Sequence, residues 1–305
     1  MDNYPKNLVE LMDLFPTEES CLEYLSLIRW PDGYECTRCK GKNVLKLGRG
    51  LYRCHTCKYE GSVIAGSLFQ GTRKPLRLWF QAIWYIVDQK NGVSALGLQK
   101  ALGFGSYHTA WEWLHKLRRA MVRPGRDKLS GLVEVNESLI GGVSSGKRGR
   151  GAEGKTLVLI GVEDTGDGIG RIRLSQISNA SGDVLGQAVQ QMIAPGSTIR
   201  TDGWNGYNGL TNLGYTHFPI TNIDVKGADA MSLTHRVSAL LKRWLLGTHH
   251  GAISHENLPY YLDEFTFRFN RRTSRSRGKL FYRLIQQALE IAPVPGKTLN
   301  TRCSG

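Results

Sequence analysis

The clearest alternation of apolar and polar side chains along the chain lies in the segment GLVEVNESLIGG. A period of two places Glu134, Asn136 and Ser138 on one face of a strand, and Val133 and Val135 on the other. Polar side chains in the inner part of a strand indicate a site more often than a solvated face. We therefore treat this strand as the first element of a candidate site.

The pattern that follows this strand predicts a sheet. Two alternating runs, residues 155–163 and 169–177, flank the turn sequence DTGDG and predict a hairpin. A helix over 181–193 follows, and a strand over 197–200 leads to Asp202. Three strands, a helix and a fourth strand in this order define the front half of an RNase-H-like sheet. Asp202 either caps the next turn or holds a metal ion at the carboxyl edge of that sheet.

Three more helices are predicted after the sheet, over residues 229–246, 254–270 and 278–291. The first carries His235 and Lys242, which are seven residues apart and so share one helix face. Small residues between them leave room above that face. This helix is therefore the second element that we expect to carry residues of the candidate site.

The first part of the chain is also predicted to contain helices. Two short helices are expected within residues 7–29, and a helix from Pro75 is apolar on nearly every side, so neighbours must bury it. Segments 94–101 and 107–121, joined by LGFGS, predict a helix-turn-helix. This pair either reads DNA or simply packs as part of a three-helix core. Its candidate DNA contacts are Lys116, Arg118 and Arg119.

The cysteine spacing predicts a metal site. Two CxxC pairs separated by fourteen residues present four thiolates from two tight turns, which is typical of a tetrahedral zinc ribbon. The predicted zinc ligands are Cys36, Cys39, Cys54 and Cys57. A redox dithiol or free core cysteines are the alternatives. Cys21 has no paired cysteine and is expected to pack as a small hydrophobic residue.

The net charge of the chain indicates which kind of partner it binds. Forty Lys and Arg against 26 Asp and Glu give +14 and an isoelectric point near 9.6, which favours a polyanion, although ribosomal and membrane-surface proteins share this balance. Two basic segments are phosphate-binding candidates. Lys147, Arg148 and Arg150 lie in a phosphate-binding arm or a disordered connector, and Arg271, Arg272 and Arg275 lie in a DNA-backbone patch or a solvated tail. With no apolar run of membrane-spanning length and no signal peptide, we expect a cytoplasmic, nucleoid-associated protein without a membrane partner.

These patterns together predict an α+β or α/β protein. Its zinc ribbon and helix-turn-helix helices precede an RNase-H-like mixed sheet with flanking helices. The expected segments are N-terminal helices (1–30), zinc ribbon (31–66), helix-turn-helix region (67–125), RNase-H-like domain (130–292) and tail (293–305).

Several short motifs, in order, carry a resemblance to a known family. Besides the CxxC pairs they are KNGVSA (90–95), VEVNE (133–137), IGG (140–142), GRIR (170–173), TDGW (201–204), LKRWLLGTH (241–249), YLDEF (261–265) and FRFNRR (267–272). Over about residues 10–290 the chain resembles insertion-sequence transposases with an N-terminal zinc ribbon and an ISXO-type DDE domain.

The resemblance implies a function and site residues. The catalytic positions correspond to Asn136, Asp202, His235 and Lys242, and Asp202 and His235 would bind Mg²⁺ or Mn²⁺. The implied reaction is metal-dependent cleavage and transfer of double-stranded DNA. The implied partners are transposon terminal inverted repeats, target DNA and further copies of the chain assembled on that DNA.

One position departs from the family pattern. The family reads VEVDE where this chain reads VEVNE, so an amide at Asn136 replaces the first aspartate. An amide cannot bridge two cations as a carboxylate does, and Glu134 or Glu137 is poorly spaced to replace it. Two functions therefore stay open: an active transposase, or an inactive DNA-binding relative that is decayed, domesticated or engineered. A zinc-ribbon transcription factor accounts for the first 125 residues alone.

Overall fold

The computed structural model describes residues 4–123, 125–141, 155–220, 231–251 and 253–294. They form two compact units, one of Met1–Pro124 with Ser274–Gly305 and one of Gly125–Thr273. The boundary between Pro124 and Gly125 falls where the predicted helix-turn-helix region (67–125) ends. No helix among these described residues is long and apolar enough to cross a membrane.

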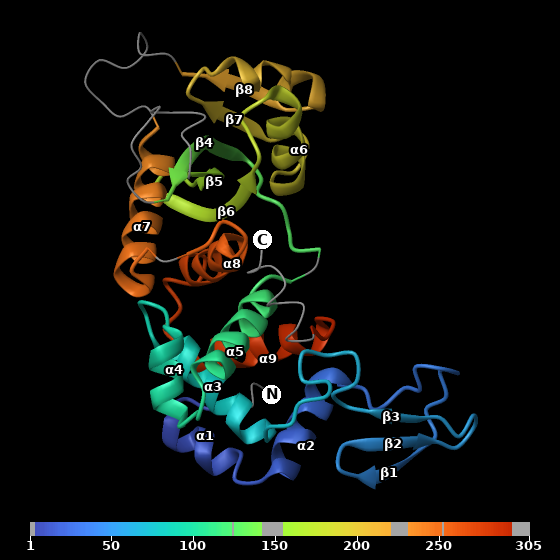
Figure 1. The fold of residues 1–305 in the computed structure, drawn as a ribbon. Helices are drawn as coiled ribbons and strands as arrows, with labels where there is room; N and C mark the ends of the chain where they lie inside the picture. Colours follow the sequence, from blue (N-terminus) through green and yellow to red (C-terminus); the bar gives the residue numbers. More distant parts are fainter. Residues whose placement is uncertain (1–3, 124, 142–154, 221–230, 252, 295–305) are drawn as a thin grey trace. The chain divides into compact units, whose positions relative to one another are not determined.

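The first unit contains the predicted helices of the N-terminal half (Figure 1). They are α1 (Leu8–Leu14), α2 (Glu18–Arg29), α3 (Leu76–Asp88), α4 (Ala95–Leu102) and α5 (Tyr107–Ala120). The apolar helix α3 is buried as expected, and Trp79 stacks on Trp113 of α5 with ring centroids 3.5 Å apart. Between α4 and α5, Gly103 has a φ of +66°, a left-handed conformation that favours glycine. The helix-turn-helix pair is thus present.

A small antiparallel sheet forms the ribbon of the same unit. Its strands are β1 (Val44–Gly48), β2 (Leu51–Cys54) and β3 (Glu60–Ser62), in the order β1-β2-β3. The rings of Tyr34 and Tyr52 stack with centroids 4.9 Å apart, and Trp30 packs edge-on against both. Such aromatic packing provides much of the apolar core that this small sheet has.

The last helix, α9 (Arg277–Glu290), belongs to the first unit. This differs from the prediction that the RNase-H-like domain extends to residue 292. The reason is aromatic packing: Phe281 of α9 lies against Phe15, Tyr24 and Phe80, with ring centroids 5.6–6.4 Å apart. The chain therefore leaves the first unit at Gly125 and returns to it at Ser274, just before α9.

The second unit is built on a mixed five-stranded sheet. Its strands are β4 (Leu132–Ile140), β5 (Thr156–Asp164), β6 (Ile169–Ile177), β7 (Thr198–Thr201) and β8 (Thr216–Pro219). The order is β6-β5-β4-β7-β8, with β4, β5 and β6 antiparallel and with β7 parallel to both β4 and β8. This arrangement confirms the predicted mixed sheet with flanking helices.

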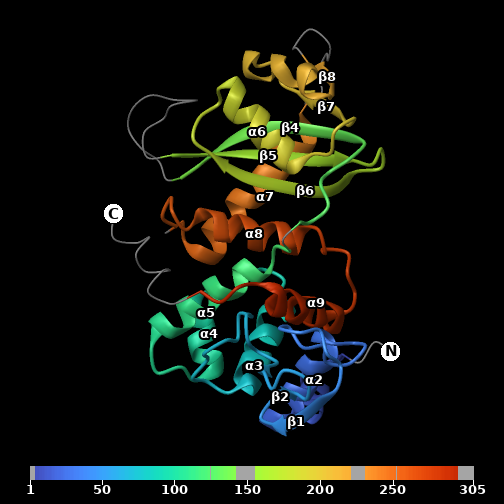
Figure 2. The ribbon, with the colours of Figure 1, turned by 90° about the vertical axis from the view of Figure 1, so that its right-hand side faces the viewer.

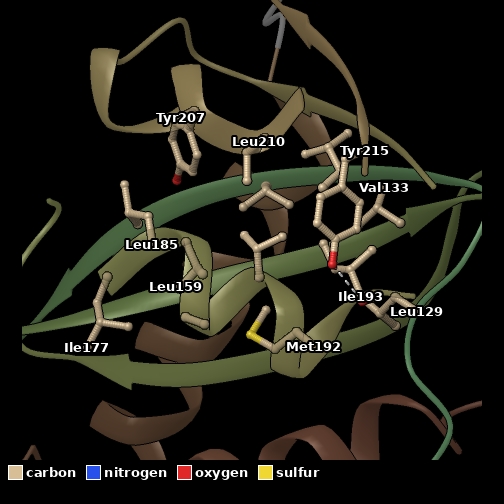
Figure 3. Packing of buried hydrophobic residues seen from close by; sticks show 14 residues of the cluster. Leu129, Val133, Leu159, Ile177, Leu185, Met192, Ile193, Tyr207, Leu210 and Tyr215 are labelled. Carbon is tan, nitrogen blue, oxygen red and sulfur yellow. Dashed lines mark hydrogen bonds between the residues drawn. The ribbon is translucent and has the colours of Figure 1, made fainter. Parts of the chain in front are cut away.

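Helices cover both faces of this sheet (Figure 2). On one face, α6 (Gly182–Met192) packs on the core that includes Val133 and Val135 (Figure 3). On the other, α7 (Ser232–His249) and α8 (Leu258–Phe269) cover apolar side chains of β5 and β6. The polar face of β4 therefore points toward α7, and the alternation seen in the sequence is confirmed.

Two elements were not predicted. A 3-10 segment at Asn205–Leu213 follows β7, and β8 then adds a short edge strand that ends at Pro219. Helix α8 also begins later than expected, because residues 254–257 form a turn before Leu258. None of these differences moves the candidate site residues to another element.

Candidate functional sites

Four cysteine sulfurs in the first unit lie within 4.8 Å of one another. The Sγ atoms of Cys36 and Cys57 are 3.6 Å apart, and those of Cys39 and Cys54 are 3.5 Å apart. A zinc ion with Zn–S bonds of about 2.3 Å sets sulfur–sulfur separations of about 3.8 Å across a tetrahedron. The cluster therefore fits a structural Zn²⁺ with four protein ligands.

The backbone around the sulfurs favours thiolates. The amides of the tight turn, first that of Cys57, donate hydrogen bonds to Cys54 and lower the pKa of its thiol to about 6. Cys21 contrasts with these ligands: it is fully buried in α2, and burial raises the pKa of its thiol to about 12. Its expected role as a small hydrophobic residue is therefore confirmed.

The second site is a cavity of about 450 Å³ in the second unit. Asn136 on β4, Asp202 just beyond β7, and His235 and Lys242 on α7 all line it. Because β4 and β7 are paired, their side chains reach the same part of the sheet. The structure thus brings together the four residues expected from the sequence.

The conformation of the loop that carries Asp202 is fixed by hydrogen bonds and by two glycines. The carboxylate of Asp202 accepts a 3.1 Å hydrogen bond from the Trp204 backbone N–H, and Gly203 has a φ of +76°. The indole N–H of Trp204 donates to the Ala180 carbonyl at 2.9 Å. A Cβ on Gly206 would lie 2.7–2.8 Å from that indole nitrogen and that carbonyl, so only glycine fits there. Asp202 therefore caps its own turn while facing the cavity.

The amide of Asn136 is already hydrogen-bonded on both sides. Its Oδ1 accepts from the Glu137 backbone N–H at 2.8 Å, and its Nδ2 lies 3.3 Å from Nε2 of His235. Asn136 therefore adds only a neutral amide to the donors of Asp202 and His235, where a bridging position needs an anionic oxygen. Within the described residues, the cysteine cluster is the one group of three or more Cys, His, Asp or Glu placed to hold an ion. The cavity as it stands does not fit a bridged metal pair.

Glu134, two residues before Asn136, is engaged elsewhere. Its carboxylate is 1% exposed and accepts hydrogen bonds from the backbone N–H and hydroxyl of Thr234 at 2.7 and 2.8 Å. Burial raises the pKa of this carboxyl, while the Thr234 hydrogen bonds and the charge of Arg200 oppose that rise. The alternation along β4 predicts the face of Glu134 correctly but gives no sign of this contact, because Thr234 is 100 residues away in the chain.

The predicted DNA-binding residues have different surroundings. Lys147, Arg148 and Arg150 lie outside the described residues. Lys116 and Arg119 are partly exposed on α5, but Arg118 is 1% exposed, so its assignment as a DNA contact is wrong.

The arginines of the basic segment after α8 also differ from one another in their contacts. The Arg272 guanidinium donates to the carbonyls of Ile169, Gly170 and Phe269. These hydrogen bonds tie α8 to β6 and give Arg272 a structural role, although its side chain is exposed. Arg271 lies over the Phe267 ring at 4.1 Å, and Arg275 is exposed.

One unit carries a four-cysteine ribbon and a helix-turn-helix pair, and the other a mixed five-stranded sheet flanked by helices, a combination typical of transposases. Residues 16–60 match the transposase zinc-ribbon domain, and residues 128–270 match the ISXO2-like transposase domain. The chain is 26% identical over 288 residues to an uncharacterised protein in transposable element ISH50 of Halobacterium salinarum, covering 87% of this chain and 94% of that relative. The chain belongs to the insertion-sequence transposases with a zinc ribbon and an ISXO2-like domain.

Proposed function

We propose that this chain binds the terminal inverted repeats of an insertion sequence and has strand-transfer chemistry that Asn136 strongly reduces. The observation that carries the proposal is the cavity where Asn136, Asp202, His235 and Lys242 converge. Three of these residues have the chemistry that cleavage and transfer of DNA require. The fourth supplies a neutral amide in place of a bridging carboxylate.

The proposed roles follow from residue chemistry. Asp202 offers an anionic oxygen and His235 an imidazole nitrogen, a pair that suits Mn²⁺ and is acceptable to Mg²⁺. Lys242, two helical turns beyond His235, is placed to hold a DNA phosphate as a point charge. In the Asn136→Asp variant a second carboxylate would join this donor set, and that variant is the one proposed to hold Mg²⁺ or Mn²⁺ firmly.

A second candidate function is a DNA-binding relative without catalytic activity. The Asn136–His235 contact of 3.3 Å favours it, because an amide and an imidazole satisfy each other there without an ion. Strand transfer on terminal-repeat DNA with Mg²⁺ or Mn²⁺ separates the two candidates. Strand-transfer activity that is lost in Asp202→Ala supports an active transposase. If neither the unaltered chain nor Asn136→Asp shows strand transfer, the inactive relative is supported.

We also propose that helix α5 contacts the DNA backbone. Changing Lys116 or Arg119 to Ala should lower the slope of log affinity against log salt by about 0.9 for each phosphate that the variant no longer neutralises. Fluorescence anisotropy on terminal-repeat DNA, measured over a salt series, gives that slope. Arg275→Ala tests the basic segment after α8 in the same assay.

Arg272→Ala is the matched control for this experiment. It removes the same charge, but the hydrogen bonds that it eliminates are to backbone carbonyls, so we expect a lower melting temperature with an unchanged salt slope. Slopes left unchanged by Lys116→Ala and Arg119→Ala together would mean that α5 only packs within its unit.

A further inference from the structure

One buried carboxylate connects the three elements that form the cavity. Oε1 of Glu134 on β4 accepts both hydrogen bonds from Thr234 on α7. Oε2 lies 3.9 Å from a guanidinium nitrogen of Arg200 on β7. Glu134 and Arg200 are also register partners in the parallel β4–β7 pair. A single side chain thus links α7 to both strands.

Glu134 and its two contacts, Thr234 and Arg200, are each close in the chain to one residue of the cavity. Asn136 lies two residues further along β4, and Asp202 lies two residues beyond the arginine. His235 directly follows the threonine. Side chains two apart on a strand share a face, and consecutive helix residues are fixed by the same turn. A side chain that holds Thr234 and Arg200 against β4 therefore also constrains His235 and Asn136, while Asp202 follows Arg200 just beyond the end of β7.

The contact also solves a local problem at the start of α7. The first amides of a helix have no intrahelical acceptor, and Met231, at the N-cap position, provides no side-chain hydrogen bond. Glu134 provides the acceptor from another element, and its negative charge suits the positive end of the helix dipole. Together with the Ser138–Ser238 hydroxyl contact one turn further along α7, this cap sets the rotation of the helix and its height above β4.

We propose that Glu134 is a positioning residue that sets the placement of α7 against β4 and β7, and so holds His235 opposite Asn136 and Asp202. The described residues that line the cavity do not include Glu134, so it acts through Thr234 rather than on DNA. This also explains why Glu134 does not replace the missing carboxylate at Asn136. The proposal rests on the proposed function only in taking these residues as the reacting centre.

The test has one spectroscopic and one kinetic measurement. Glu134→Gln keeps the size and one acceptor oxygen but removes the charge. NMR of the His235 imidazole should show ring signals shifted from those of the unaltered chain. In the Asn136→Asp background, the single-turnover strand-transfer rate should fall about 10- to 100-fold with unchanged DNA affinity. Glu163→Gln is the matched control, since it removes a carboxylate that pairs with Arg171 in the same sheet.

The two measurements separate this proposal from the proposed function. If Asn136→Asp is itself inactive, the proposed function fails, and the His235 signals alone decide the positioning role. If Glu134→Gln does not fold, Thr234→Val replaces it, because it removes the hydroxyl contact alone and should shift the same His235 signals to a smaller extent. Signals and rates that match those of Glu163→Gln would overturn the proposal.

Discussion

Replacing Asn136 by aspartate should raise strand transfer by several orders of magnitude. The amide and the carboxylate have nearly equal size, so folding and DNA affinity should be unchanged. The charge differs, and an anionic oxygen beside Asp202 and His235 can hold a divalent ion that a neutral amide cannot. Each tenfold gain corresponds to about 1.4 kcal/mol of activation barrier. The measurement is joining of terminal-repeat DNA to a target with Mg²⁺ or Mn²⁺.

Binding of Mn²⁺ gives a second readout that does not depend on turnover. Calorimetry should detect tighter Mn²⁺ binding in Asn136→Asp than in the unaltered chain, and Asp202→Ala should remove the gain. Asn179→Asp is the matched control, because it adds the same charge at an exposed position outside the cavity lining. It should change neither metal binding nor strand transfer.

A neighbouring carboxylate is the competing explanation. If the unaltered chain is fully active and Glu137→Gln abolishes that activity, Glu137 has taken over the first position. That result would show that our assignment of Asn136 is wrong. Equal, low activity in the unaltered chain and Asn136→Asp would instead favour the inactive DNA-binding relative.

Much of this arrangement could be predicted because it depends on local patterns. The period of two along β4 placed Asn136 on the polar face, and the spacing of seven placed His235 and Lys242 on one helix face. The CxxC spacing likewise predicted the cysteine cluster. Such patterns are fixed by backbone geometry within one element, so sequence alone is sufficient.

The differences between the prediction and the structure involve contacts between residues that are distant in the sequence. The amphipathic pattern of α9 shows which side is buried but not which unit buries it, and Phe281 packs on aromatic rings more than 200 residues earlier. A run of charged residues in the sequence likewise does not show what each side chain contacts. Arg272 is adjacent to Arg271 in a basic run, yet its guanidinium binds carbonyls of β6.

The cap of α7 is a similar case. The sequence places Glu134 among the inward polar residues but contains no local sign that its acceptor oxygen meets Thr234. A strand residue that caps a distant helix can be recognised only once the sheet and helix are docked. Its effect on the cavity is therefore visible from the structure alone.

Removing zinc should unfold the ribbon. A structural Zn²⁺ in a four-cysteine site contributes on the order of 10 kcal/mol to folding. The ribbon has few other sources of stability, since its three short strands cover a core of aromatic rings and cysteines. We expect one zinc per chain in purified, reduced protein, and we expect a strong chelator or Cys54→Ser to abolish it. Elemental analysis and near-ultraviolet circular dichroism measure the two effects.

Cys21→Ala is the matched control for this prediction. Cys21 is fully buried in α2 and is not part of the four-cysteine cluster, so the change should lower stability by about 1 kcal/mol while zinc stays at one per chain. His55→Ala should also keep the ion, because that exposed side chain lies between two ligands and a tetrahedral site has no fifth position. Zinc-free protein with an ordered ribbon would contradict the assignment, because sulfurs this close would then be held without a metal ion.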